Sequence, residues 1–103
     1  MTLIEFLRLP LKEKVKGIWL SGIMGEGEYI ECWSDSQIYR HSHYKDNKLN
    51  GEYKRWYVDG TLVEHSFYEN GNRHGEYKEW DVKGLLYRHC LYENGILIKD
   101  YLI

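Results

Sequence analysis

The chain has 103 residues and a formal net charge of −2, so it lacks the basic field that nucleic-acid binding requires. A chain of this length forms one domain, and ten Tyr and four Trp beside a single Pro are typical of an ordered, β-rich protein. No apolar run reaches the roughly 20 residues of a membrane span, and Glu5, Arg8 and Lys12 interrupt any signal-peptide core, so we expect a cytoplasmic protein.

Residues 1–15 predict a short helical cap in front of the first strand. An apolar stripe at helical spacing is formed by Leu3, Ile4, Phe6, Leu7 and Leu11. Thr2 and Glu5 can form a capping box, and Pro10 is expected to end or kink the helix. The alternative is an F-box-like start in LPLKEKVKGI.

Residues 16–103 are built from a repeat of 24 residues. GEYKRWYVDG, which starts at Gly51, is nearly repeated by GEYKEWDVKG at Gly75, and GEYIECWSDS at Gly27 is a fainter copy. The complete units are 27–50, 51–74 and 75–98, with partial units at 16–26 and 99–103. Repetition at a fixed period of this size is typical of a stacked array of supersecondary units.

Each unit carries two turn signals and therefore predicts two strands. The mid-unit signals are Asp35-Ser36, Asp59-Gly60 and Lys83-Gly84, and those near the end of a unit are Asp46-Asn47, Asn70-Gly71 and Asn94-Gly95. Such pairs supply the positive φ that two-residue hairpin turns need. The predicted fold is all-β, a single-layer antiparallel meander of about three hairpin units behind the N-terminal helix.

The mid-unit turn predicts which residues face each other within a hairpin. With a two-residue turn at Asp59-Gly60, each hairpin joins two opposite charges, and the signs are exchanged in the middle unit. The predicted pairs are Glu31 with Arg40, Arg55 with Glu64, and Glu79 with Arg88. Opposite charges are favourable across strands, so we expect this register.

The turn near the end of each unit predicts a second row, in which a histidine meets an acid of the next unit. The predicted pairs are His41 with Glu52, His65 with Glu76, and His89 with Asp100. A carboxylate partner raises the pKa of a histidine, so we expect stability to fall as the pH rises through the folded pKa.

The two rows separate the two faces of the sheet. The histidine face is expected to carry Trp56, Trp80, Val63, Tyr87, Phe67 and Leu91. The tyrosine face is expected to carry the Arg–Glu pairs with Tyr53, Tyr77, Tyr68, Tyr92, Leu62 and Leu86. Gly51 and Gly75 fall on the tyrosine face, where a missing side chain leaves room for a neighbouring ring. The recurring tyrosines favour packing that holds the sheet together.

Neither the histidines nor the cysteines predict a metal or catalytic site. Equivalent histidines lie two strands apart, about 9–10 Å, whereas zinc needs donors at about 2.0–2.1 Å, so His41, His65 and His89 share no ion. Cys32 and Cys90 form no CxxC pattern, which favours a reducing compartment. Cys90 points away from the neighbouring His89 on its strand. We expect no enzyme activity, no metal and no cofactor.

Units of the form GEYKxWYxDGxLxEHxxYENGxxx resemble MORN repeats, in particular the variant repeat with a G-x-Y…Y-x-x-G…Y-x-N-G skeleton. The resemblance covers residues 16–103, most closely 51–98, and extends to the repeat proteins of giant DNA viruses of amoebae. It implies a β-meander that acts in protein binding or assembly, in the host cytoplasm or in a virion. It also implies two alternatives, an antitoxin-like inhibitor of a partner protein and a phospholipid-binding module. The scattered lysines provide no basic cluster for the second alternative.

The last predicted strand, ILIKDYLI at residues 96–103, is expected to leave one edge unpaired. Natural edges are blunted by charge, proline or a bulge, and arrays end in polar caps, but here only Lys99 and Asp100 interrupt apolar residues. The candidate interaction residues are Ile96, Leu97, Ile98, Tyr101, Leu102 and Ile103. We expect Tyr101 opposite Arg88, and we expect the strand to pair with a second copy of the chain or with a strand of a protein partner.

Overall fold

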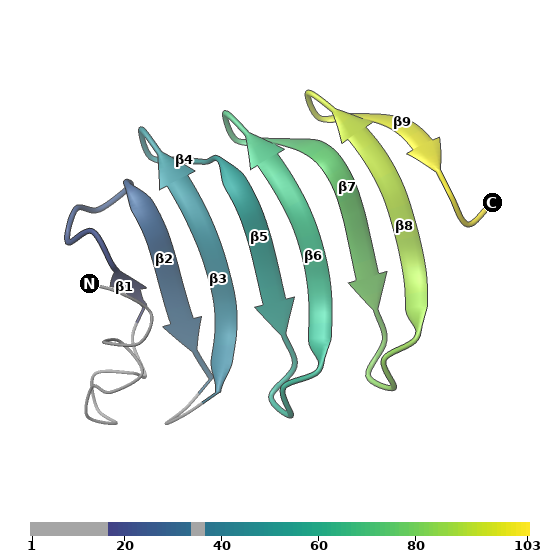
Figure 1. The fold of residues 1–103 in the computed structure, drawn as a ribbon, viewed down its shortest axis with the longest axis horizontal. Coiled ribbons are helices and arrows are strands. Elements are labelled where there is room, and N and C mark those ends of the chain that lie inside the picture. The colour runs from purple at the N-terminus through teal and green to yellow at the C-terminus, as the bar shows by residue number, and fades with distance from the viewer. Residues whose placement is uncertain (1–16, 34–36) are drawn as a thin grey trace.

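The computed structural model describes residues 17–33 and 37–103, and in these ranges it contains strands and no helix (Figure 1). The strands are β1 Ile18–Trp19, β2 Gly27–Cys32, β3 Ile38–Lys45, β4 Lys48–Leu49, β5 Gly51–Trp56, β6 Leu62–Glu69, β7 Asn72–Trp80, β8 Leu86–Glu93 and β9 Ile96–Asp100. The predicted N-terminal helix and the turn at Asp35-Ser36 lie outside the described residues.

All nine strands belong to one antiparallel sheet whose strands follow one another in chain order. The order is β1-β2-β3-β5-β6-β7-β8-β9, and β4 pairs with β3 as a short extension in line with β5 (Figure 1). The molecule measures 45 × 35 × 16 Å, and no second sheet or helix is present among the described residues to cover either face. The prediction of an all-β, single-layer meander is confirmed.

The turns near the end of each unit have two residues, as predicted. Asn70 and Gly71 adopt φ angles of 51° and 83°, and Glu69 pairs directly with Asn72. Asn94-Gly95 repeats this geometry, and the first copy reaches it with Asp46 and Asn47. Asparagine and aspartate tolerate a positive φ better than other side chains, which explains why the first copy keeps the turn without a glycine.

The mid-unit turns differ from the prediction, although the register that they set does not. The Tyr57 amide donates to the Thr61 carbonyl (2.8 Å) and the Gly60 amide donates to the Tyr57 carbonyl (2.9 Å), so the loop has three residues. A β-bulge next to this loop adds one residue to the opposite strand and restores the pairing of Arg55 with Glu64. The extra loop residue and the extra bulge residue therefore compensate each other.

A second bulge, which the sequence analysis missed, shifts the pairing between consecutive hairpins. Tyr68 pairs with Arg73 but Ser66 pairs with Tyr77, so β7 advances four residues while β6 advances two. Gly75 lies in the extra segment with a φ of 111°. Only glycine adopts such a φ without strain. The same shift separates β4 from β5 around Gly51, whose φ is 117°.

The two glycines also leave room for a neighbouring ring, as expected, and these rings belong to His43 and Phe67. A Cβ on Gly75 would lie 3.4 Å from the Cβ of Phe67, and one on Gly51 would lie 3.3 Å from the Cβ of His43. Ring atoms of the same two side chains come within 3.8 Å of the Cβ on Gly75 and within 3.7 Å of the Cβ on Gly51. Positive φ at a bulge, together with this close approach, explains why both positions are glycine.

The tightest packing lies on the tyrosine face, around one small residue in each unit. Ser42, Ser66 and Cys90 are almost completely buried, and each pairs in register with a tyrosine. The rings pack edge to face as Tyr29–Tyr44, Tyr53–Tyr68 and Tyr77–Tyr92, with centroids 6.2, 5.7 and 5.9 Å apart. A small side chain in the central slot gives the rings room to approach one another, which confirms that the tyrosines serve as packing.

A separate apolar cluster lies at the N-terminal end of the sheet. Leu20 and Ile30 are buried, and Ile18, Cys32 and Ile38 pack against them. This is the largest cluster of apolar side chains that the described residues bury, and the opposite end of the sheet has none. The C-terminal strands therefore expose apolar side chains that a second layer could cover.

Candidate functional site

The predicted interaction edge is exposed along its whole length. Strand β9 pairs with β8 on one side, and no other described strand pairs with its outer side (Figure 1). The six predicted residues have exposed fractions between 40% and 102%. Their backbone and side chains are thus accessible to a partner.

The end of this edge departs from the prediction. Strand β9 stops at Asp100, and residues 101–102 form a turn instead of continuing the strand. A one-residue shift places Asp100 opposite Cys90, so the predicted pairing of Asp100 with His89 was wrong. Tyr101 does not lie opposite Arg88, because its amide donates to the His89 carbonyl (2.8 Å) and its ring lies 4.3 Å from the His89 ring.

Strand β8 contributes a second stretch of open edge, because β9 is too short to cover it. The last pair between the two strands joins Cys90 to Asp100, so Leu86 to Arg88 have no described strand on their outer side. Leu85, Leu86 and Tyr87 are exposed. We call this stretch together with the six predicted residues the C-terminal edge, which consists of residues 85–88, 96–98 and 101–103.

The Arg–Glu row lies where the sequence predicts it. All three predicted pairs are in register, and each forms an ion pair. Arg55 Nη2 lies 3.2 Å from Glu64 Oε1, and Arg88 Nη1 lies 3.5 Å from Glu79 Oε1. Burial opposes the charge of Arg40, but hydrogen bonds to Glu31 and to a tyrosine more than offset it, so the pKa of Arg40 is raised.

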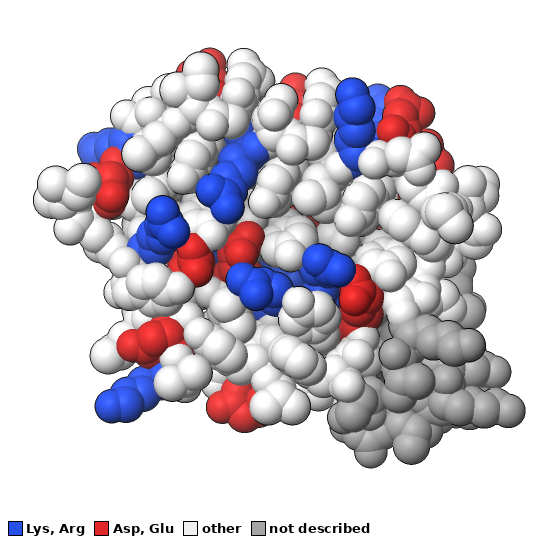
Figure 2. Space-filling view, turned by 180° about the vertical axis from the view of Figure 1, so that it is seen from behind, with Lys and Arg blue, Asp and Glu red and all other residues white. Residues whose placement is uncertain are grey.

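The register also brings like charges together at the boundaries between units. Arg40 lies opposite Arg55, and Glu64 lies opposite Glu79. Basic and acidic groups are consequently interleaved in a band across one face, without a large patch of either sign (Figure 2). Like charges opposite each other are unfavourable. The exchanged signs of the middle unit therefore destabilise the contacts between units, although they leave the pairing within each hairpin favourable.

Two tyrosine hydroxyls stabilise the boundary between the second and third units, where Glu64 lies opposite Glu79. Tyr77 and Tyr87 both donate to the Glu79 carboxylate, the latter at 2.6 Å. Burial would raise the pKa of Glu79, but these hydrogen bonds outweigh it and lower that pKa. Tyr87 was expected on the opposite face, the histidine face. Tyr87 is the extra residue of the β8 bulge, and bulges redirect side chains in this way.

The predicted pairing of each histidine with an acid of the next unit was wrong. His65 lies opposite Lys54 and Lys78, because the bulge at Gly75 shifts the register by two residues. Each histidine instead pairs diagonally with the acid of its own unit. The distances from histidine Nε2 to the nearest carboxylate oxygen are 3.4 Å for His41–Glu28, 2.8 Å for His65–Glu52 and 3.5 Å for His89–Glu76.

The predicted direction of the histidine pKa shift was wrong for His41. Burial lowers the pKa of His41, the nearby His43 lowers it further, and the attraction of Glu28 does not compensate. A histidine whose folded pKa lies below its unfolded value stabilises the fold above that unfolded value, near 6.5. This contribution is lost as the pH falls through the folded pKa, which is the opposite of the expected trend.

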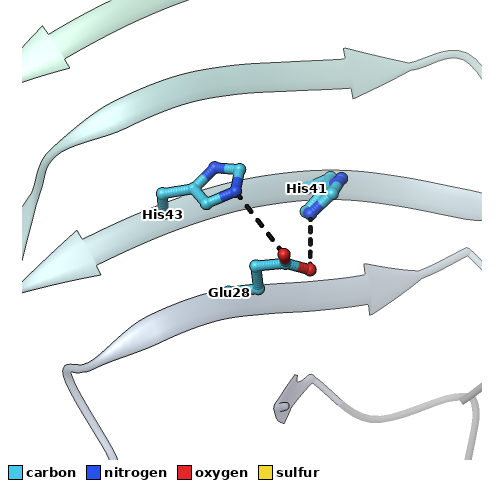
Figure 3. A group of neighbouring side chains, drawn as sticks. All are labelled: Glu28, His41 and His43. Atoms are coloured by element: carbon cyan, nitrogen blue, oxygen red, sulfur yellow. Dashed lines mark ion pairs between the residues drawn. The ribbon is translucent and has the colours of Figure 1, made fainter. Parts of the chain in front are cut away.

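One cluster of metal-ligand side chains was missed entirely. Glu28 on β2 and His41 and His43 on β3 point toward one another on the same side of the sheet (Figure 3). The sequence His41-Ser42-His43 contained the signal, because residues two apart on a strand share a face. The repeat does not reveal this signal, because His43 occurs in the first unit alone, whereas His41 has an equivalent histidine in every complete unit.

No protein-family model, curated protein or solved structure matches the chain. The resemblance to MORN repeats therefore stays a prediction based on the residues quoted above. Within residues 17–33 and 37–103, no helix has the length and apolar character that crossing a membrane requires. Any function assigned to the chain consequently depends on its own surfaces.

Proposed function

We propose that the chain is a non-enzymatic interaction protein that binds an extended segment of a protein partner along its C-terminal edge. The observation that supports this proposal is the exposed, apolar outer side of β9 and of the first half of β8. An open edge offers unpaired N–H and C=O groups to an added strand, and alternating side chains of that strand reach both faces of the sheet.

The surroundings of the edge suit such an added strand. A shallow hollow adjoins β9, lined by His74, Gly75, Leu91, Tyr92, Glu93 and Ile98, and it can accept one apolar side chain of the partner. Leu97 and Ile98 are each about half exposed. Covering such apolar surface contributes roughly 25 cal/mol per Å², so the edge can provide affinity as well as register.

The charges of the edge favour a partner segment that is apolar and carries an acidic residue. Arg88 is half exposed at the open part of β8, and Lys99 projects from β9. Charge complementarity fixes register and suppresses wrong partners. An acid in the bound segment can pair with Arg88, whose present partner Glu79 lies on its other side. A second copy of the chain is the alternative occupant.

The family resemblance is compatible with this proposal. The MORN-like units imply a protein-binding or assembly role, and the antitoxin-like alternative would use the same edge with a different partner. A phospholipid module has less support, because basic and acidic groups are interleaved on the face shown in Figure 2, which therefore lacks a basic patch for anionic headgroups.

A display library of extended peptides, selected on the whole chain, tests the proposal. The expected ligands have alternating apolar residues and one acid. Leu97→Lys and Ile98→Pro should abolish their capture, because the first places a charge and the second a proline on the edge. Val82→Lys is the matched control, since Val82 is even more exposed than Leu97 but lies in a loop.

Two outcomes would contradict the proposal. Peptides captured equally by the edge variants and by the control would show that the edge is not the binding surface. Light scattering on the same proteins identifies the other occupant, because a dimer that forms with rising concentration and is lost in Leu97→Lys means that a second copy covers the edge.

A further inference from the structure

The first unit differs from the other two around one acid that all three units share. In the second unit, Lys54 Nζ lies 3.7 Å from Glu52 Oε2, and in the third, Lys78 Nζ lies 3.7 Å from Glu76 Oε2. The first unit has Ile30 in place of the lysine, and Ile30 is completely buried. The acid of the first unit therefore lacks the cation that balances its charge in the other two.

A second imidazole stands beside the acid of the first unit. His43 takes the position that Phe67 and Leu91 occupy in the other units. Its Nε2 lies 3.9 Å from Glu28 Oε1, and His41 Nε2 lies 3.4 Å from Glu28 Oε2 (Figure 3). One ligand atom from each of the three side chains falls within 4.8 Å of the others.

Both imidazoles direct Nε2 toward the acid without a hydrogen bond there. His43 Nδ1 lies 2.9 Å from the Glu52 carbonyl oxygen, which can only accept, so Nδ1 carries a proton and donates it, while Nε2 faces Glu28. His41 Nε2 is buried and has no hydrogen-bond partner. Metal-binding histidines usually donate their second N–H to a carbonyl or carboxylate in this way. A cation between the three side chains would satisfy both nitrogens and the carboxylate.

We propose that Glu28, His41 and His43 bind one Zn²⁺ ion, with a fourth position open to water. Two imidazole nitrogens and a carboxylate suit zinc, whereas Mg²⁺ and Ca²⁺ prefer oxygen ligands. Tetrahedral zinc bonds of about 2.0–2.1 Å separate neighbouring donors by about 3.4 Å. The two histidines approach different oxygens of Glu28, His41 Nε2 lying 3.4 Å from Oε2 and His43 Nε2 lying 3.9 Å from Oε1. The three ligand atoms lie within 4.8 Å of one another, so side-chain rotations must draw them closer around the ion.

The ion would tie β2 to β3 and replace the missing lysine charge. Glu28 lies on β2 and both histidines lie on β3, so the bound ion links the two strands of the first hairpin. Ligand binding to the folded state alone raises stability. Zinc should therefore stabilise the whole chain against urea, while Mg²⁺ should not.

Calorimetric titration of the whole, metal-free chain with zinc chloride tests the site, together with the urea midpoint measured with and without zinc. We expect one ion per chain. His43→Phe should weaken binding on the order of a hundredfold or more, because loss of outer-shell partners alone costs about 10–100-fold. Phe is the residue of the second unit at this position, so the variant should fold as the wild type does. Both cysteines remain in every variant.

Introducing the same three ligands into the second unit tests whether they are sufficient to bind zinc. The second unit already brings His65 Nε2 within 2.8 Å of Glu52 Oε2. Lys54→Ile combined with Phe67→His copies the arrangement of the first unit, so the stoichiometry should rise from one ion to two. Equal zinc binding by the wild type and His43→Phe, no binding by the wild type, or a single ion in the combined variant would each overturn the proposal.

Discussion

At the scale of single residues, equivalent positions in the repeat act as controls for one another. Ser66 Oγ donates to Glu64 Oε2 at 3.0 Å, whereas the Ser42 hydroxyl is buried without a hydrogen-bond partner. The third unit has Cys90 in the same slot. A buried hydroxyl without a partner destabilises the fold by about 1–3 kcal/mol, so the two serines should respond differently to the same substitution.

Ser42→Ala should raise the free energy of unfolding by about 1 kcal/mol, because it removes an unsatisfied buried group. Ser66→Ala should lower it by about 1 kcal/mol, because it removes a hydrogen bond to Glu64. Urea denaturation of both variants, with an unchanged m-value as the check on the fold, gives the comparison. Equal losses in the two variants would mean that Ser42 has a partner after all.

Single residues also explain why only part of the candidate site could be predicted from the sequence. The Arg–Glu pairs were found because opposite charges repeat in three units at one register. The histidine partners were not, because φ angles at Gly51 and Gly75 create bulges that no alternation pattern reveals. His43 was missed because it breaks the repeat instead of following it.

At the scale of strands, the order of the two charges in the middle hairpin places a like charge opposite each neighbouring hairpin. Both like-charge contacts, Arg40 with Arg55 and Glu64 with Glu79, disappear if the middle unit adopts the order of the other two. The row would then alternate in sign from β2 to β8. Each corrected cross-strand pair contributes roughly 0.2–1 kcal/mol.

The double variant Arg55→Glu with Glu64→Arg should be more stable than Arg55→Glu alone, because it restores opposite charges across the hairpin. Loss of the hydrogen bond from Ser66 to Glu64 offsets the gain from the removed like-charge contacts, so its stability should be close to that of the wild type. Arg55→Glu alone should be less stable than Arg55→Ala, since it places an acid opposite the buried Glu64. Urea midpoints of the wild type, Arg55→Glu, Glu64→Arg and the double variant form a double-mutant cycle. Losses that simply add in the double variant would show that the two positions are not in contact.

The register between strands was predictable where a pair of complementary side chains identifies it, and not where a bulge alone shifts it. The mid-unit loop has one residue more than expected, yet Arg55 still meets Glu64, because the neighbouring bulge absorbs the difference. The end of β9 was mispredicted by one residue, because Lys99 replaces the bulge glycine of the other units and the bulge becomes shorter.

At the scale of the whole molecule, each described strand forms its ladder of hydrogen bonds only with its neighbours, in a sheet 16 Å thick. Stability in such an array is approximately a sum of units and of the interfaces between them. Removing one unit should therefore shorten the sheet without unfolding it, provided that the new boundary is favourable. Deletion of residues 51–74 joins Asn50 to Gly75 and brings Arg40 opposite Glu79, which are opposite charges.

The deletion variant should fold with an unchanged β-sheet circular dichroism spectrum per residue. Its urea m-value should fall by about a quarter, because the m-value scales with the surface exposed on unfolding. Deletion of 75–98 is the comparison, since it leaves Glu64 at the end of the row without Glu79 or Arg88. An unfolded 51–74 deletion variant would show that the units are not independent.

The thinness of the sheet has a consequence for how the protein can change over generations. A globular domain shares one interior, so a new polar group in one element disturbs all the elements packed around it. Here the first copy exchanges a lysine for Ile30 and an apolar side chain for His43, while the other copies keep their contacts unaltered. After a unit is duplicated, substitutions in one copy can therefore create a new binding site, while the other copies keep the contacts that hold the sheet together.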